Sequence, residues 1–450
     1  MTMLQRGLIL LILAVAVSPS RAEDDTVLTL PRAIQLALDR NPEVQVSAAQ
    51  LEEFKGKVQE VRAGAFPTIK ADGFGLRLRD PSFLNSSSFD DLPPDFRQAL
   101  VPRAANLFDA GVGLKQTLYS AGKVRNGIRL AKEGEQEKTD TLESVRRSIA
   151  LRVLEAFHDC LLSVANLAVL RETRDQRQKQ LDLARSRFEL GVATEIDVLR
   201  SQVNLANVEP DIIRAENRIR LARAALNTLL VRDLEAPTEV AGRLEYRPWA
   251  VPPVRSLQQE ALERRPEVLG ARHAVAQTRI LERLADSENK LNVEFDTRWG
   301  VNVRDLENVL DLSYTRWNFT VKFELPLYDG GRKAGLLVQA RSRQRAAEQT
   351  LAQIENNIKL EIQSAFDILR ASSEAIAVAR LNVTQAERVL EMMQSNYRYG
   401  AATTLDVIDS QTSLSQARNT ENNATYAHEV AKARLRHAAG RTLLDEEETK

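Results

Sequence analysis

The sequence contains few of the residues that build disulfide scaffolds, metal sites or bulky globular cores. Its 450 residues include one cysteine, four histidines and only 5% aromatic residues. A single cysteine excludes an internal disulfide, so we interpret Cys160 as a small buried core residue. The four histidines show no close metal-ligand spacing, and we expect neither a metal nor another cofactor. Scarce aromatic side chains and plentiful alanine suit helices that approach one another closely.

Long apolar segments are also lacking, with one exception at the start. Residues 1–22 combine a positive start at Arg6, a ten-residue apolar run and a small-x-small site. This is the pattern of a cleaved signal peptide, and ten apolar residues are too few to span a bilayer. We find no later apolar window of about 18 residues, so we expect no transmembrane helix. Any membrane span would have to consist of strands.

An excess of charge of either sign is absent as well. Removal of residues 1–22 takes away Arg6 and Arg21, which leaves 60 basic residues against 62 acidic ones and a net charge near −2. A chain so close to neutral lacks the basic footprint of a nucleic-acid-binding protein. We therefore expect no nucleic acid among its partners.

What the sequence does contain is a long coiled-coil pattern that ends in a turn. Twelve mostly apolar or small residues follow one another at spacings of 4 and 3, the a/d pattern of a helix in coiled-coil contact. They are Ile358, Ile362, Ala365, Leu369, Ser372, Ile376, Ala379, Val383, Ala386, Leu390, Met393 and Tyr397. Just beyond, Gly400 can end this helix, and Thr403 with Asp406 can cap the next one. The stretch predicts a very long helix, a tight turn and a returning helix.

The same turn occurs 209 residues earlier, which indicates a tandem duplication. Residues 191–198 match residues 400–407, and Tyr119 matches Tyr328 at the same offset. Each unit of a repeat protein usually needs a neighbour to bury its apolar face. We expect a signal peptide (1–22), a first repeat (23–231), a linker (232–254), a second repeat (255–440) and an acidic tail (441–450).

Each repeat should carry two strands before its long hairpin. The expected strands are 68–79, 108–118, 293–304 and 317–325, and the expected hairpin tips are 191–197 and 400–409. In the first hairpin we expect an apolar stripe that includes Val164 and Ala168, and a returning helix from Thr194 to about Leu230 that is bent at Pro210.

The strands of the second repeat alternate between apolar and polar residues. Trp299 and Trp317 fit the membrane-interface aromatics of a barrel wall. A half-buried sheet in a soluble sandwich would show the same alternation. Four strands are too few to close a barrel over lipid, so several chains must contribute if this sheet faces lipid.

The signal peptide, the duplicated helix–strand–strand–helix–turn–helix order and the two Gly-x-Ala-Thr turns together resemble the TolC-type outer-membrane factor family. The resemblance extends over essentially the whole mature chain. It implies a mainly α-helical fold with a small membrane β part, in which a homotrimer forms a twelve-stranded barrel in outer-membrane lipid and a helical tunnel through the periplasm. It further implies a passive channel rather than an enzyme, serving tripartite efflux or type I secretion. Its partners would be a periplasmic adaptor protein and an inner-membrane pump of the RND or ABC type.

The resemblance also assigns roles to residues at the two tips. The turns that would contact the adaptor are Gly191, Val192, Ala193 and Thr194, and Gly400, Ala401, Ala402 and Thr403. Asp406 and Asp409 match the acidic pair that lines the family's aperture.

Further aperture candidates are Asp197, Arg200 and Tyr397. Helix capping alone explains Asp197 and Asp406. It does not explain Asp409, whose counterpart in the first repeat is Arg200. We hypothesise that Arg200 pairs with a carboxylate of a neighbouring chain, with Tyr397 donating a hydrogen bond.

Two other functions are compatible with parts of the sequence. Glu155-x-x-His158 has the spacing of one di-iron ligand pair, but its counterparts in the second repeat are Ser364 and Asp367. Because no nucleophile–base pair is recognisable, the sequence does not favour an enzyme. A periplasmic coiled-coil adaptor would show one helical hairpin flanked by small β modules. Two hairpins, each joined to a strand pair, favour the channel.

Overall fold

The structure is a computed structural model that describes residues 27–79, 92–100 and 104–443. The predicted signal peptide and most of the predicted acidic tail lie outside the described residues. The elements in chain order are β1 (Val27–Leu28), α1 (Leu30–Arg40), α2 (Pro42–Ala63), β2 (Thr68–Leu78), α3 (Pro94–Ala99), β3 (Ala105–Tyr119), α4 (Lys123–Glu189), α5 (Glu195–Ala206), α6 (Glu209–Leu230), β4 (Glu239–Val240), α7 (Val254–Arg264), α8 (Pro266–Asp286), β5 (Asn292–Val303), the short 3-10 turns η3 (Leu306–Leu310) and η4 (Leu312–Tyr314), β6 (Thr315–Glu324), α9 (Arg332–Arg398) and α10 (Thr404–Ala438).

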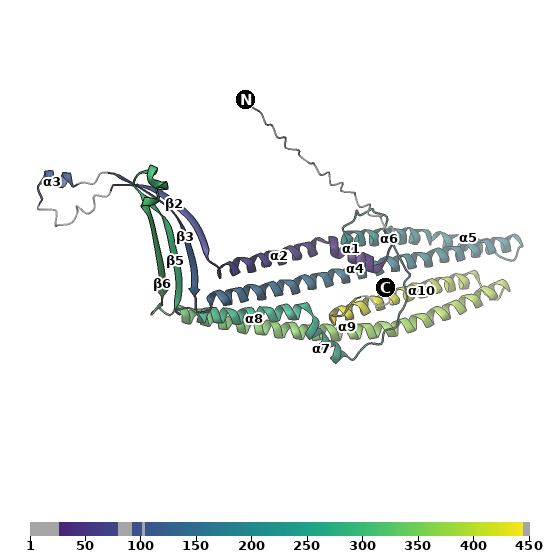
Figure 1. The fold of residues 1–450 in the computed structure, drawn as a ribbon. Helices are drawn as coiled ribbons and strands as arrows, with labels where there is room; N and C mark the ends of the chain where they lie inside the picture. The colour runs from purple at the N-terminus through teal and green to yellow at the C-terminus, as the bar shows by residue number, and fades with distance from the viewer. Residues whose placement is uncertain (1–26, 80–91, 101–103, 444–450) are drawn as a thin grey trace, which may run out of the picture.

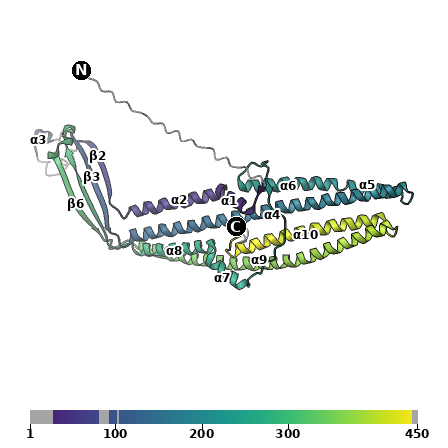
Figure 2. The same cartoon turned by 45° about the vertical axis from the view of Figure 1, so that its right-hand side comes forward.

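Each repeat contributes one helix of 67 residues, α4 and α9. At 1.5 Å per residue, each is about 100 Å long. Both begin after a glycine in the left-handed conformation, Gly122 with φ 87° and Gly331 with φ 86°, where a side chain would be strained. Figures 1 and 2 show both long helices running from the sheet to the opposite end of the molecule. They are the axes along which all other helices pack.

Four elements lie side by side at every level of the molecule. The sheet has the order β2-β3-β5-β6, with antiparallel neighbours throughout. In the adjoining tier α2 packs on α4, α4 on α8 and α8 on α9. In the tier farthest from the sheet α5 and α6 pack on α4, α4 on α10 and α10 on α9. The chain is therefore one four-wide layer with two open edges.

The two faces of the sheet differ in chemistry. The register places Trp299 opposite Trp317 and Thr297 opposite Phe319 on one face, and the Trp317 side chain there is 66% exposed. The strand ends differ from the expected ones: β3 begins at residue 105 instead of 108, and β6 covers 315–324 instead of 317–325.

The other face carries an ionic network that links all four strands. The carboxylate of Asp109 on β3, 1% exposed, accepts hydrogen bonds from Arg298 on β5 and Arg316 on β6. Arg298 also donates to Asp72 on β2. A Cβ at Gly111 would lie 3.2 Å from Nε of Arg298, so this glycine makes room for the arginine to reach across β3.

The coiled-coil pattern of α9 is its packing face. All twelve predicted positions are buried or half-buried, and seven, including Ile362 and Leu369, are fully buried. Cys160 is also buried, as predicted, and burial raises the pKa of its thiol to about 12.

Three expectations were wrong in detail. Val164 and Ala168 are exposed and Leu167 is buried instead, because a coiled-coil face alternates spacings of 3 and 4 while the predicted stripe used mostly 4. The returning helix is divided at Asn207–Val208 into α5 and α6, since Pro210 has no N–H to donate to the preceding turn. The third expectation was that no apolar window of about 18 residues follows the signal peptide. One stretch of α4 is in fact long and apolar enough to cross a membrane. We interpret it as a core stretch, because α4 packs against α1, α6 and α10.

Candidate functional site

The two hairpins end in turns of the same geometry at the end of the molecule farthest from the sheet. Gly191 has φ 75° and its N–H donates to the Phe188 carbonyl at 2.9 Å. Gly400 has φ 79°, and the next residue, Ala401, donates to the Asn396 carbonyl at 2.8 Å. Glycine adopts this backbone conformation without strain and lets each helix end abruptly.

The predicted turn residues lie at the surface of both tips. Those that are exposed are Gly191, Val192, Thr194, Gly400, Ala401 and Thr403, and those that are half-buried are Ala193 and Ala402. Both turns therefore leave their backbone and small side chains open to another molecule.

A carboxylate caps the returning helix at each tip. Asp406 accepts hydrogen bonds from the Thr403 hydroxyl and the Thr403 backbone N–H, both at 2.7 Å. Asp197 accepts the same pair from Thr194 at 2.7 and 3.1 Å. The side-chain hydrogen bonds from these threonines are the main reason that the pKa values of Asp197 and Asp406 lie below the ordinary aspartate value. Both groups stay charged in mildly acidic water.

Asp409 and Arg200 are also exposed, at equivalent positions of the two tips. Asp409 follows Asp406 by one helical turn on α10, so both carboxylates lie near the second tip. Arg200 adds a weaker attraction that lowers the pKa of Asp197. Within the described residues, Arg200 forms no ion pair.

Tyr397 joins the two tips. Its side chain is 5% exposed and packs with Leu390, Val407 and Leu414. The Thr404 hydroxyl lies 3.3 Å from the Tyr397 hydroxyl and 3.0 Å from a carboxylate oxygen of Asp197. A threonine hydroxyl has one proton, so Thr404 gives it to the carboxylate and accepts from Tyr397. This chain of hydrogen bonds runs from the second tip to the first.

Arg187 makes a second connection between the hairpins. Its guanidinium lies 4.8 Å from the centre of the Tyr397 ring and donates to the Tyr397 backbone carbonyl. That carbonyl lies in the last turn of α9 and also accepts the Gly400 backbone N–H at 3.1 Å, so Arg187 is its second donor. Arg187 and Thr404 were not among the residues predicted for the site. The difference between the two repeats could have identified them. The counterpart of Arg187 is Asn396 and that of Thr404 is Glu195, and helix capping does not explain why the repeats differ at these positions.

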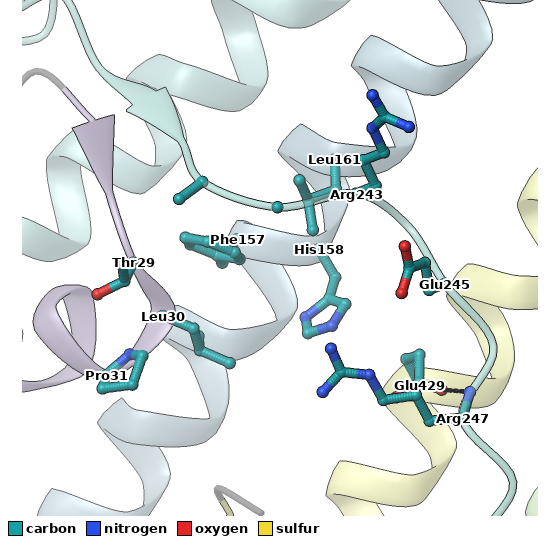
Figure 3. A pocket seen from close by; sticks show the side chains of 12 residues that line it. Thr29, Leu30, Pro31, Phe157, His158, Leu161, Arg243, Glu245, Arg247 and Glu429 are labelled. Carbon is teal, nitrogen blue, oxygen red and sulfur yellow. Dashed lines mark hydrogen bonds between the residues drawn. The ribbon is translucent and has the colours of Figure 1, made fainter. Parts of the chain in front are cut away.

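A separate cavity lies near the middle of the layer, between the start of α1, α4, the linker and α10 (Figure 3). Its volume is about 680 Å³, and His158, Arg243, Glu245, Arg247 and Glu429 contribute its polar groups. The Arg247 backbone N–H donates to Glu429 at 3.2 Å, which attaches the linker to α10. With the parallel pairing of β1 and β4, this forms a belt of linker and N-terminal segment around the middle of the layer.

The di-iron spacing noted in the sequence does not produce a ligand set. Glu155 receives a hydrogen bond from Arg434 at 2.7 Å, and Nδ1 of His158 faces the Leu154 carbonyl at 2.9 Å. Among residues 27–79, 92–100 and 104–443, no group of three or more His, Cys, Asp or Glu side chains is arranged to hold a metal ion.

Comparison with known proteins identifies a family and relatives that are similar to this chain. The family model for outer membrane efflux proteins matches residues 33–231 and 257–441, which is most of both repeats. The outer membrane protein TolC of Vibrio cholerae is 25% identical over 76% of this chain and 79% of its own length. The alkaline protease secretion protein AprF of Pseudomonas aeruginosa is 23% identical over 94% of this chain and 86% of its own.

Solved structures agree on the fold. The open state of the Neisseria gonorrhoeae MtrE outer membrane channel superposes with a TM-score of 0.78 at 18% identity, over 92% of this chain and 89% of that one. The VceC outer membrane protein of Vibrio cholerae gives 0.76 at 19% identity, over 92% and 97%.

These matches confirm the mainly helical fold with its small β part, the outer-membrane location and the efflux or secretion channel that the sequence predicts. They give no support to the periplasmic adaptor alternative. Because the family model covers far more than half of the sequence, the chain belongs to the outer membrane efflux protein family.

Proposed function

We propose that three copies of this chain form a continuous passive duct through the outer membrane and the periplasm. The observation that carries the proposal is the four-wide layer, which has the same two open edges in the sheet and in both helical tiers. A layer of this kind is one segment of a tube. Joining one edge of each copy to the opposite edge of the next closes the sheet and the helices together.

The sheet supplies the strongest reason for closure. In the part of the chain that the structure describes, β2 and β6 each pair with one neighbour, so their outer backbone groups need partners. An open strand edge is not tolerated in hydrocarbon. Three copies of four strands give a barrel of twelve (3 × 4), with the face of Trp299 and Trp317 toward lipid and the Asp109 network toward water.

The helical edges carry matching apolar surfaces. On α5, Ile196, Leu199 and Val203 are exposed at helical spacing. On α9, the helix at the opposite edge of the layer, Val378 and Met392 are exposed. Packing these two edges between protomers buries side chains that would otherwise face water.

The tips would form the aperture and the contact with other components. In a trimer, Asp406 and Asp409 place six carboxylates (3 × 2) around the axis, which favours passage of cations. The exposed turns at Gly191–Thr194 and Gly400–Thr403 would receive the adaptor. An inner-membrane pump of the RND or ABC class would supply energy and select the cargo. Relatives named for protease secretion and cation efflux support such partners.

Single-channel recording tests the proposal. The purified mature protein in planar bilayers should give a small cation-selective conductance, and the Asp406→Ala/Asp409→Ala variant should lose the selectivity. Glu195→Ala, which removes one carboxylate from the first turn of α5, is the control and should retain it. Well-folded protein without conductance would contradict the duct. Arg200→Ala in the same assay tests the proposed contact with a neighbouring chain, which an unchanged conductance would exclude.

A further inference from the structure

A cluster of three basic residues lies where the sheet meets the helices. Arg125, Arg129 and Lys132 are all exposed and stand at i, i+4 and i+7 on α4, which places them on one face of the helix. Within the described residues, none of the three has a carboxylate partner. By contrast, the nearby Lys123 pairs with Glu288 at 3.1 Å.

The three residues border a cavity with apolar walls. Its volume is about 450 Å³, and it is lined by the end of β3, by the segment after α2 and by the first turns of α4. Leu118 and Tyr119 at the end of β3 are 58% and 53% exposed. The cavity thus combines a positively charged rim with an exposed aliphatic side chain and an exposed tyrosine.

Its level in the molecule matches a lipid headgroup layer. β2, β3, β5 and β6 contain 10 to 15 residues each, and a membrane strand needs about 9–11. The strands are therefore long enough to span the outer membrane, and their ends next to the helices reach its periplasmic boundary. Tyrosine is enriched at such boundaries.

The cluster faces away from the neighbouring helices of its own tier. Gly127 and Gly134 of α4 lie against Val61 and Phe54 of α2, and His273 of α8 faces Glu133 of α4. Because α4 is an inner element of the layer, a neighbouring protomer would contact α2 and α9 and leave this face open.

The second repeat shows that the fold does not demand these charges. The counterparts of Arg125 and Arg129 on α9, 209 residues later, are Ala334 and Val338. The counterpart of Lys132 is Arg341, which pairs with Glu282 at 2.9 Å. Within the described residues, this position therefore carries three cations without an ion pair in the first repeat, and one cation in an ion pair in the second.

We infer that Arg125, Arg129 and Lys132 bind the phosphate of an anionic phospholipid in the periplasmic leaflet. Leu118 and Tyr119 contact its glycerol and acyl region. The inference rests on the outer-membrane location and not on the proposed aperture, so a channel with altered tip residues would still bind the lipid.

Native mass spectrometry of the purified full-length mature protein tests the inference. Dimyristoyl phosphatidylglycerol should bind more tightly than dimyristoyl phosphatidylcholine. At about 1 kcal/mol per basic residue near a membrane surface, each residue removed should weaken phosphatidylglycerol binding about 5-fold. Arg125→Ala/Arg129→Val, which installs the residues of the second repeat, should therefore cost about 25-fold.

Two comparisons make the result decisive. Arg341→Ala removes one positive charge at the counterpart of Lys132 and should leave binding unchanged. Arg125→Gln/Arg129→Gln serves if the first variant fails to fold. Equal binding of the two lipids by the unaltered protein, or full retention of phosphatidylglycerol by either double variant, would overturn the inference. Displacement of the lipid by millimolar inorganic phosphate would also overturn it, because it would indicate a simple anion pocket.

Discussion

Arg187 should hold the two hairpin tips of one protomer together, and Arg187→Ala should release them. The side chain stacks on the Tyr397 ring and donates to the Tyr397 carbonyl. A hydrogen bond from a charged group contributes about 1.5–3 kcal/mol and a cation–π contact about 0.5–2 kcal/mol. Because Arg187 is half-buried, we take about 2 kcal/mol in total, near the lower end of the combined range.

This magnitude predicts a measurable change in the channel. About 2 kcal/mol shifts the equilibrium between joined and separated tips about 30-fold in one protomer. If three protomers open together, the contributions add to about 6 kcal/mol. Planar-bilayer recordings of Arg187→Ala should therefore show longer or larger openings than the unaltered channel. Arg187→Lys keeps the charge but loses the planar guanidinium, so it should restore closure only in part.

The control lies two residues away on the same helix. Arg185 is exposed, and within the described chain it has no ion pair or ring contact. Arg185→Ala should therefore behave like the unaltered channel, and both variants should still form intact trimers. If Arg187→Ala forms intact trimers whose conductance equals that of Arg185→Ala, the connection through Tyr397 does not control the aperture.

Two further predictions concern the sheet and the caps. In Gly300→Ala the new Cβ would collide with the backbone carbonyl oxygen of Ala110. Since backbone cannot move aside cheaply, we expect the free energy of unfolding to fall by about 3 kcal/mol or more. Gly113→Ala, with 3.6 Å to its nearest neighbour, should cost far less when both are compared by thermal melting followed by circular dichroism. The helix caps should respond to acid. Because the pKa values of Asp197 and Asp406 lie below the ordinary aspartate value of 3.8, the two carboxylates stabilise the tips above pH 3.8, and this stabilisation is lost as the pH falls below 3.8. In Thr403→Ala the pKa of Asp406 should rise toward its ordinary value, so the stability that the second tip loses in acid should become smaller. Hydrogen exchange of the tip amides as a function of pH would show this, and an unchanged profile would contradict the role of the threonine.

Local patterns in the sequence predicted the elements well. The a/d spacing identified the buried face of α9 because a coiled-coil contact repeats along the chain. The two glycine turns were predictable because few residues adopt a positive φ. The strand pairs were predictable because alternation of polar and apolar residues reflects two different faces.

Contacts between distant segments were not predictable in this way. Arg187 and Tyr397 are separated by 210 residues, and no local pattern connects an arginine to a carbonyl that far along the chain. The break at Val208 was expected as a bend, since the effect of Pro210 depends on how the surrounding helices accommodate it. The buried position of Asp109 is likewise decided by arginines on two other strands.

The unpaired edges of β2 and β6 have a genetic consequence. If closure of the barrel requires all three subunits, one chain whose edge strand cannot pair prevents closure of every trimer that contains it. In a cell that makes equal amounts of sound and defective chains, random mixing leaves about one assembly in eight (½ × ½ × ½) wholly sound. Mutations at these edges should therefore be dominant, whereas loss of the whole gene product should be recessive.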